Sequence, residues 1–212
     1  MKLWTLATTA TVLIISASAN ASLIGRDLDG NLTTAEAYYD DQTNLTWLAD
    51  TNYAMTSGYD SDGRMNWVDA NNWAIELDIN GYSNWRLPST ENGCTGSTCY
   101  QSELGSIYFR HLMIDDSYWP VILNHDSFIN LQSAAYWSSS YYNPGGLEGG
   151  IYFDMYNAIQ FYEYNEASLH YAWALSDGDI GMAVSAVPIP AAIWLFGSGL
   201  VGLIGLARRK KV

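Results

Sequence analysis

The sequence predicts an α+β fold, a single domain with two main helices and short antiparallel strands. Short segments that alternate polar and apolar residues, separated by Gly, Asn, Asp and Ser, dominate the chain, as is typical of strands joined by turns. Only two stretches have the apolar spacing of an amphipathic helix. The region from residue 22 to residue 186 suits one domain in length, and no repeat or low-complexity linker divides it.

The first predicted helix runs from about Trp67 to Leu77. Asn66 precedes it as the N-cap, and Asp69 follows three residues later, close to a capping box. Its apolar residues fall on one face and its acidic residues on the other, so we expect it to pack on a core. A second helix is expected from Ser102 to about His111, with an apolar stripe.

Six segments have the composition or alternation of strands. They are Leu45 to Leu48, Tyr82 to Leu87, Ala135 to Ser138, Gly150 to Met155, Ile159 to Tyr164 and Tyr171 to Leu175. Four glycines between residues 145 and 150 predict a turn before the fourth of them.

Residues 1–21 have the pattern of a secretory signal peptide. Lys2 is followed by an apolar region from Leu3 to Ile15 and then by small residues that end in Ala19-Asn20-Ala21. This pattern predicts cleavage before Ser22 and export of the mature chain.

Residues 187–212 predict a C-terminal transmembrane helix with a basic end. The 17 uncharged residues from Ala191 to Ala207 would span about 25 Å as a helix, against a hydrocarbon core of about 30 Å. Arg208 and Arg209 begin a run of four basic residues, which would hold the C-terminus in the cytoplasm and leave the preceding residues outside.

This tail resembles the PEP-CTERM class of sorting signals of Gram-negative bacteria, in the variant that begins Val-Pro-Leu-Pro-Ala. The matching residues are Val187, Pro188, Ile189, Pro190 and Ala191, with Ile189 in place of Leu. The resemblance implies an exosortase as partner, a membrane enzyme that cuts near the proline motif. It also implies a protein that is anchored in the inner membrane, transiently or permanently, and then reaches the cell surface or the extracellular matrix.

Cys94 and Cys99 are the only cysteines, and in an exported chain they predict a disulfide that closes a small loop. By the chain-entropy estimate, so small a ring adds about 2 kcal/mol to stability. A redox or metal-binding role for the pair is the alternative.

Residues 22–186 are strongly acidic and rich in aromatic side chains. They contain four arginines and no lysine against all 22 acidic residues, a formal charge of −18. Such a surface repels phosphate, which excludes nucleic acid as a partner and leaves cations, neutral glycans and basic proteins. The alternative is that the charge only keeps the protein soluble. Seven tryptophans and 16 tyrosines exceed what one core can hold, so some rings are expected at the surface.

Five blocks of this region resemble the Lcl C-terminal-like domains of exported bacterial proteins. They are Asn44-Leu45-Thr46-Trp47-Leu48, Met65-Asn66-Trp67 with Asp69-Ala70, Gly81 to Pro88, Tyr136-Trp137-Ser138-Ser139-Ser140 and Tyr171-Ala172-Trp173-Ala174. The resemblance implies a fold similar to the C-type-lectin-like and formylglycine-generating-enzyme fold over residues 22–186.

The block Trp85-Arg86-Leu87-Pro88 is interpreted as structural. A guanidinium beside Trp85 is expected to be half-buried and bound by a carboxylate or by carbonyls, so that Arg86 braces the fold. Leu87 precedes Pro88 and is therefore held extended. A role of Arg86 in ligand binding is the alternative.

Few residues have the spacing of a catalytic or metal centre. Asp27 with Asp29, and Asp60 with Asp62, place carboxylates in turn-forming loops and are weak calcium candidates, with ordinary solvated turns as the alternative. The histidines have no zinc spacing. Hydrolysis by paired carboxylates and a copper oxidase that uses the cysteine pair stay open as enzymatic alternatives.

The leading hypothesis is therefore a non-catalytic, exported surface or matrix protein that binds a glycan or a surface protein without a required cofactor. Trp137, Tyr141 and Tyr142 are the candidate contact residues, because they lie beside the serine run and the glycine-rich turn. An exported enzyme and a purely structural matrix component are the alternatives.

Overall fold

The structure, a computed structural model of the chain, describes residues 23–90, 94–113, 127–143, 149–165 and 167–183. The predicted signal peptide, the sorting motif with Val187, Pro188 and Pro190, and the apolar tail with Arg208 and Arg209 lie outside these residues. Within the described ranges, no helix is long and apolar enough to cross a membrane.

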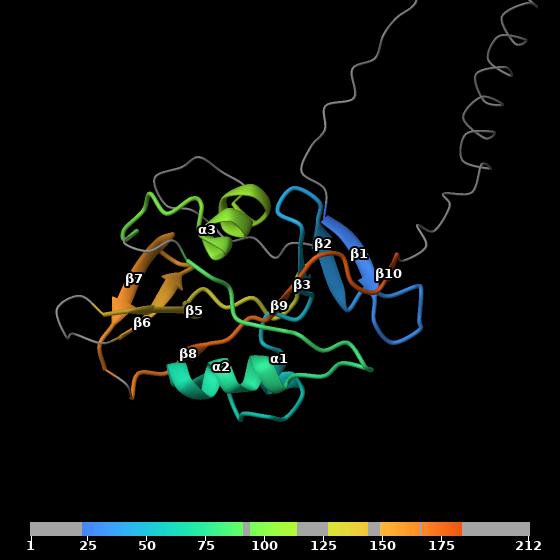
Figure 1. Cartoon of the computed structure of the whole chain (residues 1–212), viewed down its shortest axis with the longest axis horizontal. Coiled ribbons are helices and arrows are strands. Elements are labelled where there is room, and N and C mark those ends of the chain that lie inside the picture. The colour runs from blue at the N-terminus through green and yellow to red at the C-terminus, as the bar shows by residue number, and fades with distance from the viewer. Residues whose placement is uncertain (1–22, 91–93, 114–126, 144–148, 166, 184–212) are drawn as a thin grey trace, which may run out of the picture.

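One antiparallel sheet brings together the first and last strands of the described chain (Figure 1). Its order is β10 (Met182–Ala183), β1 (Leu23–Asp27), β2 (Ala37–Asp40), β3 (Leu45–Leu48) and β9 (Leu175–Asp177). Arg26 of β1 pairs with Ala183 of β10. The turn between β2 and β3 uses Asn44 at a φ of 56°, a left-handed conformation that asparagine tolerates.

The second sheet carries the longest strands. Its order is β4 (Arg64–Met65), β8 (His170–Tyr171), β5 (Ala135–Tyr142), β6 (Gly149–Asp154) and β7 (Ile159–Glu163). Its pairs are antiparallel except for β5 with β8, which is parallel. The register between β5 and β6 shifts between Trp137 and Tyr141, which bends β5 at that point.

The helical segments are α1 (Tyr53–Thr56), α2 (Trp67–Glu76), α3 (Glu103–Ile107) and the π-helical turn η1 (Tyr108–Leu112). In Figure 1, α2 lies below the strands and α3 above them. The predicted cap of α2 is confirmed, because the Asn66 side chain accepts a hydrogen bond from the Asp69 N–H. The second predicted helix starts as expected after Ser102, then widens to a π-turn in which the Met113 N–H donates to the Tyr108 carbonyl.

The α+β class is confirmed, with two sheets of mainly antiparallel strands and few helices. The predicted strands in the regions of β3, β5, β6 and β7 are present, and β5 is longer than expected. Strands β1, β2, β4 and β10 were not predicted. β1 and β2 include buried Arg26, Asp27 and Asp40, and such charged residues hide the alternation that marks a strand.

The prediction of a strand over 82–87 is wrong. Asn80, Gly81 and Asn84 have φ values of 54°, 91° and 69°, which curl the chain and exclude a continuous extended segment. Only isolated bridges form here, one of them between Arg86 and Leu175.

The predicted strand over 171–175 is two strands in different sheets, β8 and β9. The residues between them are fully buried, and the Trp173 ring lies 4.7 Å from that of Trp47 and 4.9 Å from that of Phe128. Its indole N–H donates to the Leu48 carbonyl at 2.8 Å. The apolar run therefore marks the place where the chain crosses the hydrophobic core that the two sheets share.

Candidate functional site

An open pocket of about 590 Å³ lies where the start of α2 faces the second sheet. The surface of the pocket is mainly apolar, and it also contains carboxylate and amide side chains. The lining residues are Asn66 to Asp69, Trp137, Tyr141, Gly149, Gly150, Glu163 and Asn165. Four elements, α2, β5, β6 and β7, therefore contribute to one concave surface.

Trp67 and Tyr141 form the aromatic wall of the pocket. Their ring centroids are 4.9 Å apart, with planes inclined by 46°. The indole N–H of Trp67 donates to the Ser138 carbonyl at 2.8 Å, which fixes the ring against β5. Tyr141 is 39% exposed, so a ligand in the pocket can reach an aromatic face that is already held in place.

Glycines in β6 make room for these rings. A Cβ atom at Gly150 would lie 2.4 Å from Cδ1 of Trp67, and one at Gly149 would lie 2.4 Å from the Glu163 carbonyl oxygen. Any larger residue at these two positions would displace the indole or the β6–β7 pairing. The sequence analysis counted both glycines in the turn and began the predicted strand at Gly150, whereas the structure begins β6 at Gly149.

The polar groups of the pocket are hydrogen-bond acceptors and amides. Asp69 accepts a hydrogen bond from the Asn66 side-chain amide at 2.7 Å, and Glu163 accepts one from the backbone N–H of Asn165 at 2.9 Å. No arginine or lysine is among the lining residues. The pocket is therefore suited to a neutral or cationic ligand that carries hydroxyl or amino groups.

The expectation that Trp137 is exposed is wrong, because the residue is 1% exposed, whereas its role as a contact residue stays a prediction. Its indole N–H donates to the Met65 carbonyl at 2.7 Å, and its ring lies 4.3 Å from that of His170. Burial lowers the pKa of His170, so the imidazole beside Trp137 is neutral near pH 7. Trp137 is nevertheless among the lining residues, so it forms part of the floor of the pocket.

Tyr142 belongs to a row of tyrosines next to the pocket. Its ring stacks on that of Tyr162 at 4.6 Å, with planes 8° apart, and Tyr162 lies 4.8 Å from Tyr164. Tyr164 is 41% exposed. The tyrosines thus extend the aromatic surface beyond the pocket over β5 and β7.

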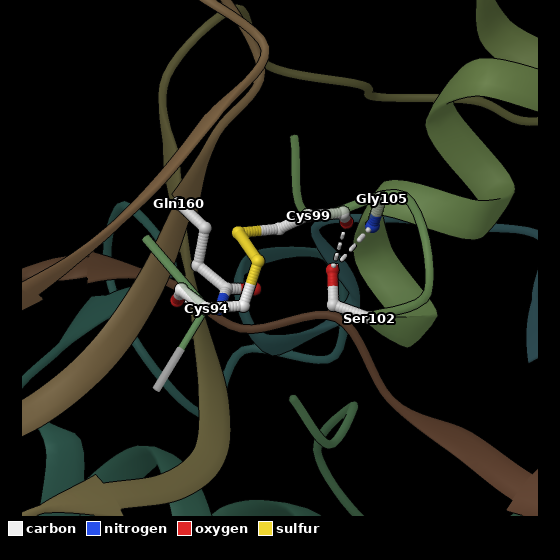
Figure 2. Close-up of a disulfide and its surroundings, with 5 residues drawn as sticks. All are labelled: Cys94, Cys99, Ser102, Gly105 and Gln160. Atoms are coloured by element: carbon white, nitrogen blue, oxygen red, sulfur yellow. Dashed lines mark hydrogen bonds between the residues drawn. A yellow bond between two sulfur atoms is a disulfide. The ribbon is translucent and has the colours of Figure 1, made fainter. Parts of the chain in front are cut away.

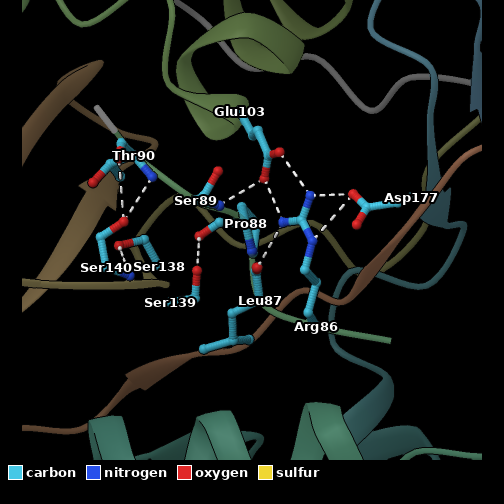
Figure 3. A network of polar contacts seen from close by, with 10 residues as sticks. All are labelled: Arg86, Leu87, Pro88, Ser89, Thr90, Glu103, Ser138, Ser139, Ser140 and Asp177. Atoms are coloured by element: carbon cyan, nitrogen blue, oxygen red, sulfur yellow. Dashed lines mark hydrogen bonds and ion pairs between the residues drawn. The ribbon is translucent and has the colours of Figure 1, made fainter. Parts of the chain in front are cut away.

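Arg86 braces the fold, as the sequence analysis expected (Figure 3). Its guanidinium donates to both oxygens of Glu103 at 2.7 and 2.8 Å, and also to Asp177 and the Leu87 carbonyl. The hydrogen bonds to Glu103 are the main reason why the pKa of Arg86 is raised above its ordinary value. Arg86 thereby joins the start of α3 to β9, and it is not among the residues that line the aromatic pocket.

Two neighbours of Arg86 have structural roles of the same kind. The indole N–H of Trp85, which is 2% exposed, donates to the Tyr82 carbonyl, and the Pro88 carbonyl accepts from the Ser139 N–H at 2.8 Å. The segment 85–88 is therefore held on both sides without being a strand.

The predicted disulfide between Cys94 and Cys99 is confirmed, with a Cα–Cα distance of 5.7 Å (Figure 2). The Gln160 side-chain amide donates to the Cys94 carbonyl at 2.7 Å, and the Ser102 hydroxyl donates to the Cys99 carbonyl at 2.9 Å. The disulfide loop therefore fixes β7 relative to the start of α3. Both sulfur atoms are in the disulfide, so the chain has no thiolate for a copper ion.

The two aspartate loops proposed as weak calcium candidates have different surroundings. Carboxylate oxygens of Asp27, Asp29 and Glu36 all lie within 4.8 Å of one another. Asp62 instead forms an ion pair with Arg64 at 2.7 Å, and neither Asp60 nor Asp62 belongs to such a cluster among the described residues.

Trp67, Asp69 and Glu163 are site residues that sequence reasoning missed. Trp67 was assigned to the core face of its helix, although it is only half-buried and lines the pocket. Its position one residue after the helix N-cap was the available signal, since the first turn of a helix is open on its N-terminal side.

Comparisons with models of protein families, with curated proteins and with solved structures find no match to this chain. What the pocket binds therefore has to be inferred from its own geometry and charge.

Proposed function

We propose that the protein is a non-catalytic binding and adhesion module of the cell surface or extracellular matrix, whose pocket holds a sugar ring of a surface glycan. The observation that carries the proposal is the pair of rings, Trp67 and Tyr141, in an open pocket beside Asp69 and Glu163. Aromatic faces pack on the C–H face of a sugar, and carboxylates accept hydrogen bonds from its hydroxyls.

The charge of the molecule supports the same ligand class. The whole chain has a formal charge of −13, and the pocket contains two carboxylates and no basic side chain. Anionic ligands are repelled, whereas neutral and amino sugars are not. A basic surface protein is the other partner that this charge would accept.

Export and sorting form part of the proposal. The signal-peptide pattern, the disulfide and the PEP-CTERM-like tail all support an exported protein that is handled by an exosortase at the inner membrane. The C-type-lectin-like arrangement is likewise proposed, with support from the α+β class and the two sheets. Mass spectrometry of the mature protein tests the sorting step, because an intact C-terminus at Val212 would exclude cleavage.

The binding test compares two exposed tyrosines in the full chain. A glycan array identifies the ligand, and calorimetry then measures its affinity for the unmodified chain and two variants. Tyr141→Ala should weaken binding at least about tenfold, because it removes half of the aromatic wall. Tyr156→Ala, at a residue that is 57% exposed and outside the pocket lining, should leave the affinity unchanged. The proposal fails if no glycan binds or if both variants weaken binding equally.

A carboxylate-based hydrolase is the second candidate, because Asp69 and Glu163 line the same pocket. Release of reducing ends from the bound glycan distinguishes the two functions. Turnover that Asp69→Asn or Glu163→Gln abolishes would overturn the non-catalytic proposal, whereas binding without turnover supports it. A purely structural matrix component would bind none of the glycans.

A further inference from the structure

We propose that Asp27, Asp29 and Glu36 bind a calcium ion in the loop that joins β1 to β2. The three carboxylates each place an oxygen within 4.8 Å of the other two. Calcium binds carboxylate oxygens at about 2.3–2.6 Å, so two of its ligand atoms are separated by at most about 5 Å. Three oxygens within this limit are close enough for one calcium ion to bridge them after a small adjustment of the side chains.

Asp27 gives the independent reason for a ligand. The residue is fully buried, and its Oδ1 accepts hydrogen bonds from the N–H groups of Asp29 and Gly30 at 2.9 and 2.8 Å. Its Oδ2 is also buried and has no hydrogen-bond partner among the described residues. A buried carboxylate oxygen without a donor is costly, and a cation bound to it would remove that cost.

Side chains of the described residues do not supply that cation. All four arginines of this part of the chain form ion pairs elsewhere: Arg26 with Asp179, Arg64 with Asp62, Arg86 with Glu103 and Asp177, and Arg110 with Asp40. The described ranges contain no lysine. Three neighbouring carboxylates therefore repel one another without a basic partner, which favours a divalent cation between them.

The loop also offers access and an ordered set of ligands. Asp29 is exposed, and together with half-buried Glu36 it lines a cavity of about 340 Å³, so two of the three carboxylates border an open space. Oε2 of Glu36 accepts a hydrogen bond from the Leu28 N–H at 3.0 Å. This hydrogen bond holds the Glu36 carboxylate against the loop between β1 and β2. Calcium fits this set better than magnesium, because magnesium retains its waters and takes few protein carboxylates.

The test is calorimetric titration of the chelator-treated full chain with calcium chloride at about 0.15 M salt, where diffuse ion binding is screened. One ion should bind with a dissociation constant between micromolar and millimolar, the range of calcium modules. Glu36→Gln and Asp29→Asn should each weaken this binding at least tenfold, and both keep a side chain of the original size. Calcium should also raise the midpoint of thermal unfolding of the unmodified chain more than it does for either variant.

Asp62→Asn is the matched control, because Asp62 occupies the same position as Asp29 in an equivalent turn. It should leave the affinity for calcium unchanged. The proposal is overturned if the unmodified chain binds no calcium ion, if Asp62→Asn weakens binding as much as Asp29→Asn does, or if magnesium chloride binds as tightly as calcium chloride.

Discussion

Residues 27–30 and residues 60–63 share the pattern Asp-x-Asp-Gly and fold into the same turn. In each loop the first aspartate accepts hydrogen bonds from the N–H groups two and three residues later, at 2.9 and 2.8 Å in both cases. Gly30 and Gly63 take similar positive φ values, 90° and 77°. The backbone of the two turns is therefore set by the local sequence alone.

The side chains that surround the two turns are different. Glu36 brings a third carboxylate to the first turn, and Asp27 is buried there. In the second turn the guanidinium of Arg64 neutralises Asp62, and the buried polar group behind the turn is the uncharged Asn52. The comparison teaches that a turn motif places carboxylates, while residues outside the motif decide whether those carboxylates need a cation.

The largest expected difference between the loops comes from their glycines. A Cβ atom at Gly63 would lie 1.7 Å from Oδ1 of Asn52, whereas one at Gly30 would meet no atom within 4 Å. Gly30→Ala should lower the free energy of unfolding by about 1 kcal/mol, because alanine is strained in the left-handed conformation. Gly63→Ala should lower it by about 3 kcal/mol, because the buried Asn52 side chain must also move. Denaturant unfolding of both variants measures the difference.

Equal losses of stability in the two glycine variants would contradict this expectation. They would mean that Asn52 moves aside freely, although it is 2% exposed and its amide lies 3.4 Å from the Asp62 carbonyl. The close packing that distinguishes the second loop would then have no energetic consequence.

A buried charge should have the next largest effect. Asn52→Asp places a buried carboxylate behind the second loop, as Asp27 does in the first, and we expect a loss of about 2 kcal/mol near pH 7 from its desolvation. Asn52→Leu removes the same hydrogen bonds without adding a charge and serves as the control. If the aspartate variant were no less stable than the leucine variant, burial of a carboxylate would not lower the stability of this fold. The unpartnered oxygen of Asp27 would then no longer indicate a cation.

The parts of the fold that could be predicted are those in which local sequence decides the outcome. The alternation in β6 and the cap at Asn66 depend on neighbours in sequence, and both are as expected. The curled segment at 80–84 and the crossing at Trp173 depend on left-handed residues and on burial between two sheets. An apolar run cannot distinguish a strand from such a crossing.

The candidate site shows the same limit. Tyr141 was predicted because it lies near glycines, and it does line the pocket. Trp137, four residues earlier, lines the same pocket but is 1% exposed, because its ring packs on that of His170 and its indole N–H is bound to the Met65 carbonyl. Glu163 could not be assigned, because its place in the pocket depends on the pairing of β7 with β6.

The smallest expected effect is a shift in the titration of Asp62. The hydrogen bond from the Arg64 side chain is the main reason why the pKa of Asp62 is lower than its ordinary value, which is about 3.9 in an unfolded chain. Because the folded pKa is the lower one, this pair stabilises the protein above about pH 3.9, and the effect is lost as the pH falls through the folded value. Arg64→Gln should therefore raise the pKa of Asp62, and Arg64→Lys, which keeps the charge without the planar fork, should raise it less. The carboxyl carbon shift of Asp62, followed by NMR against pH, measures both changes. An unchanged titration in Arg64→Gln would show that the arginine does not neutralise the second loop, and the charge difference between the two loops would then have to come from another group.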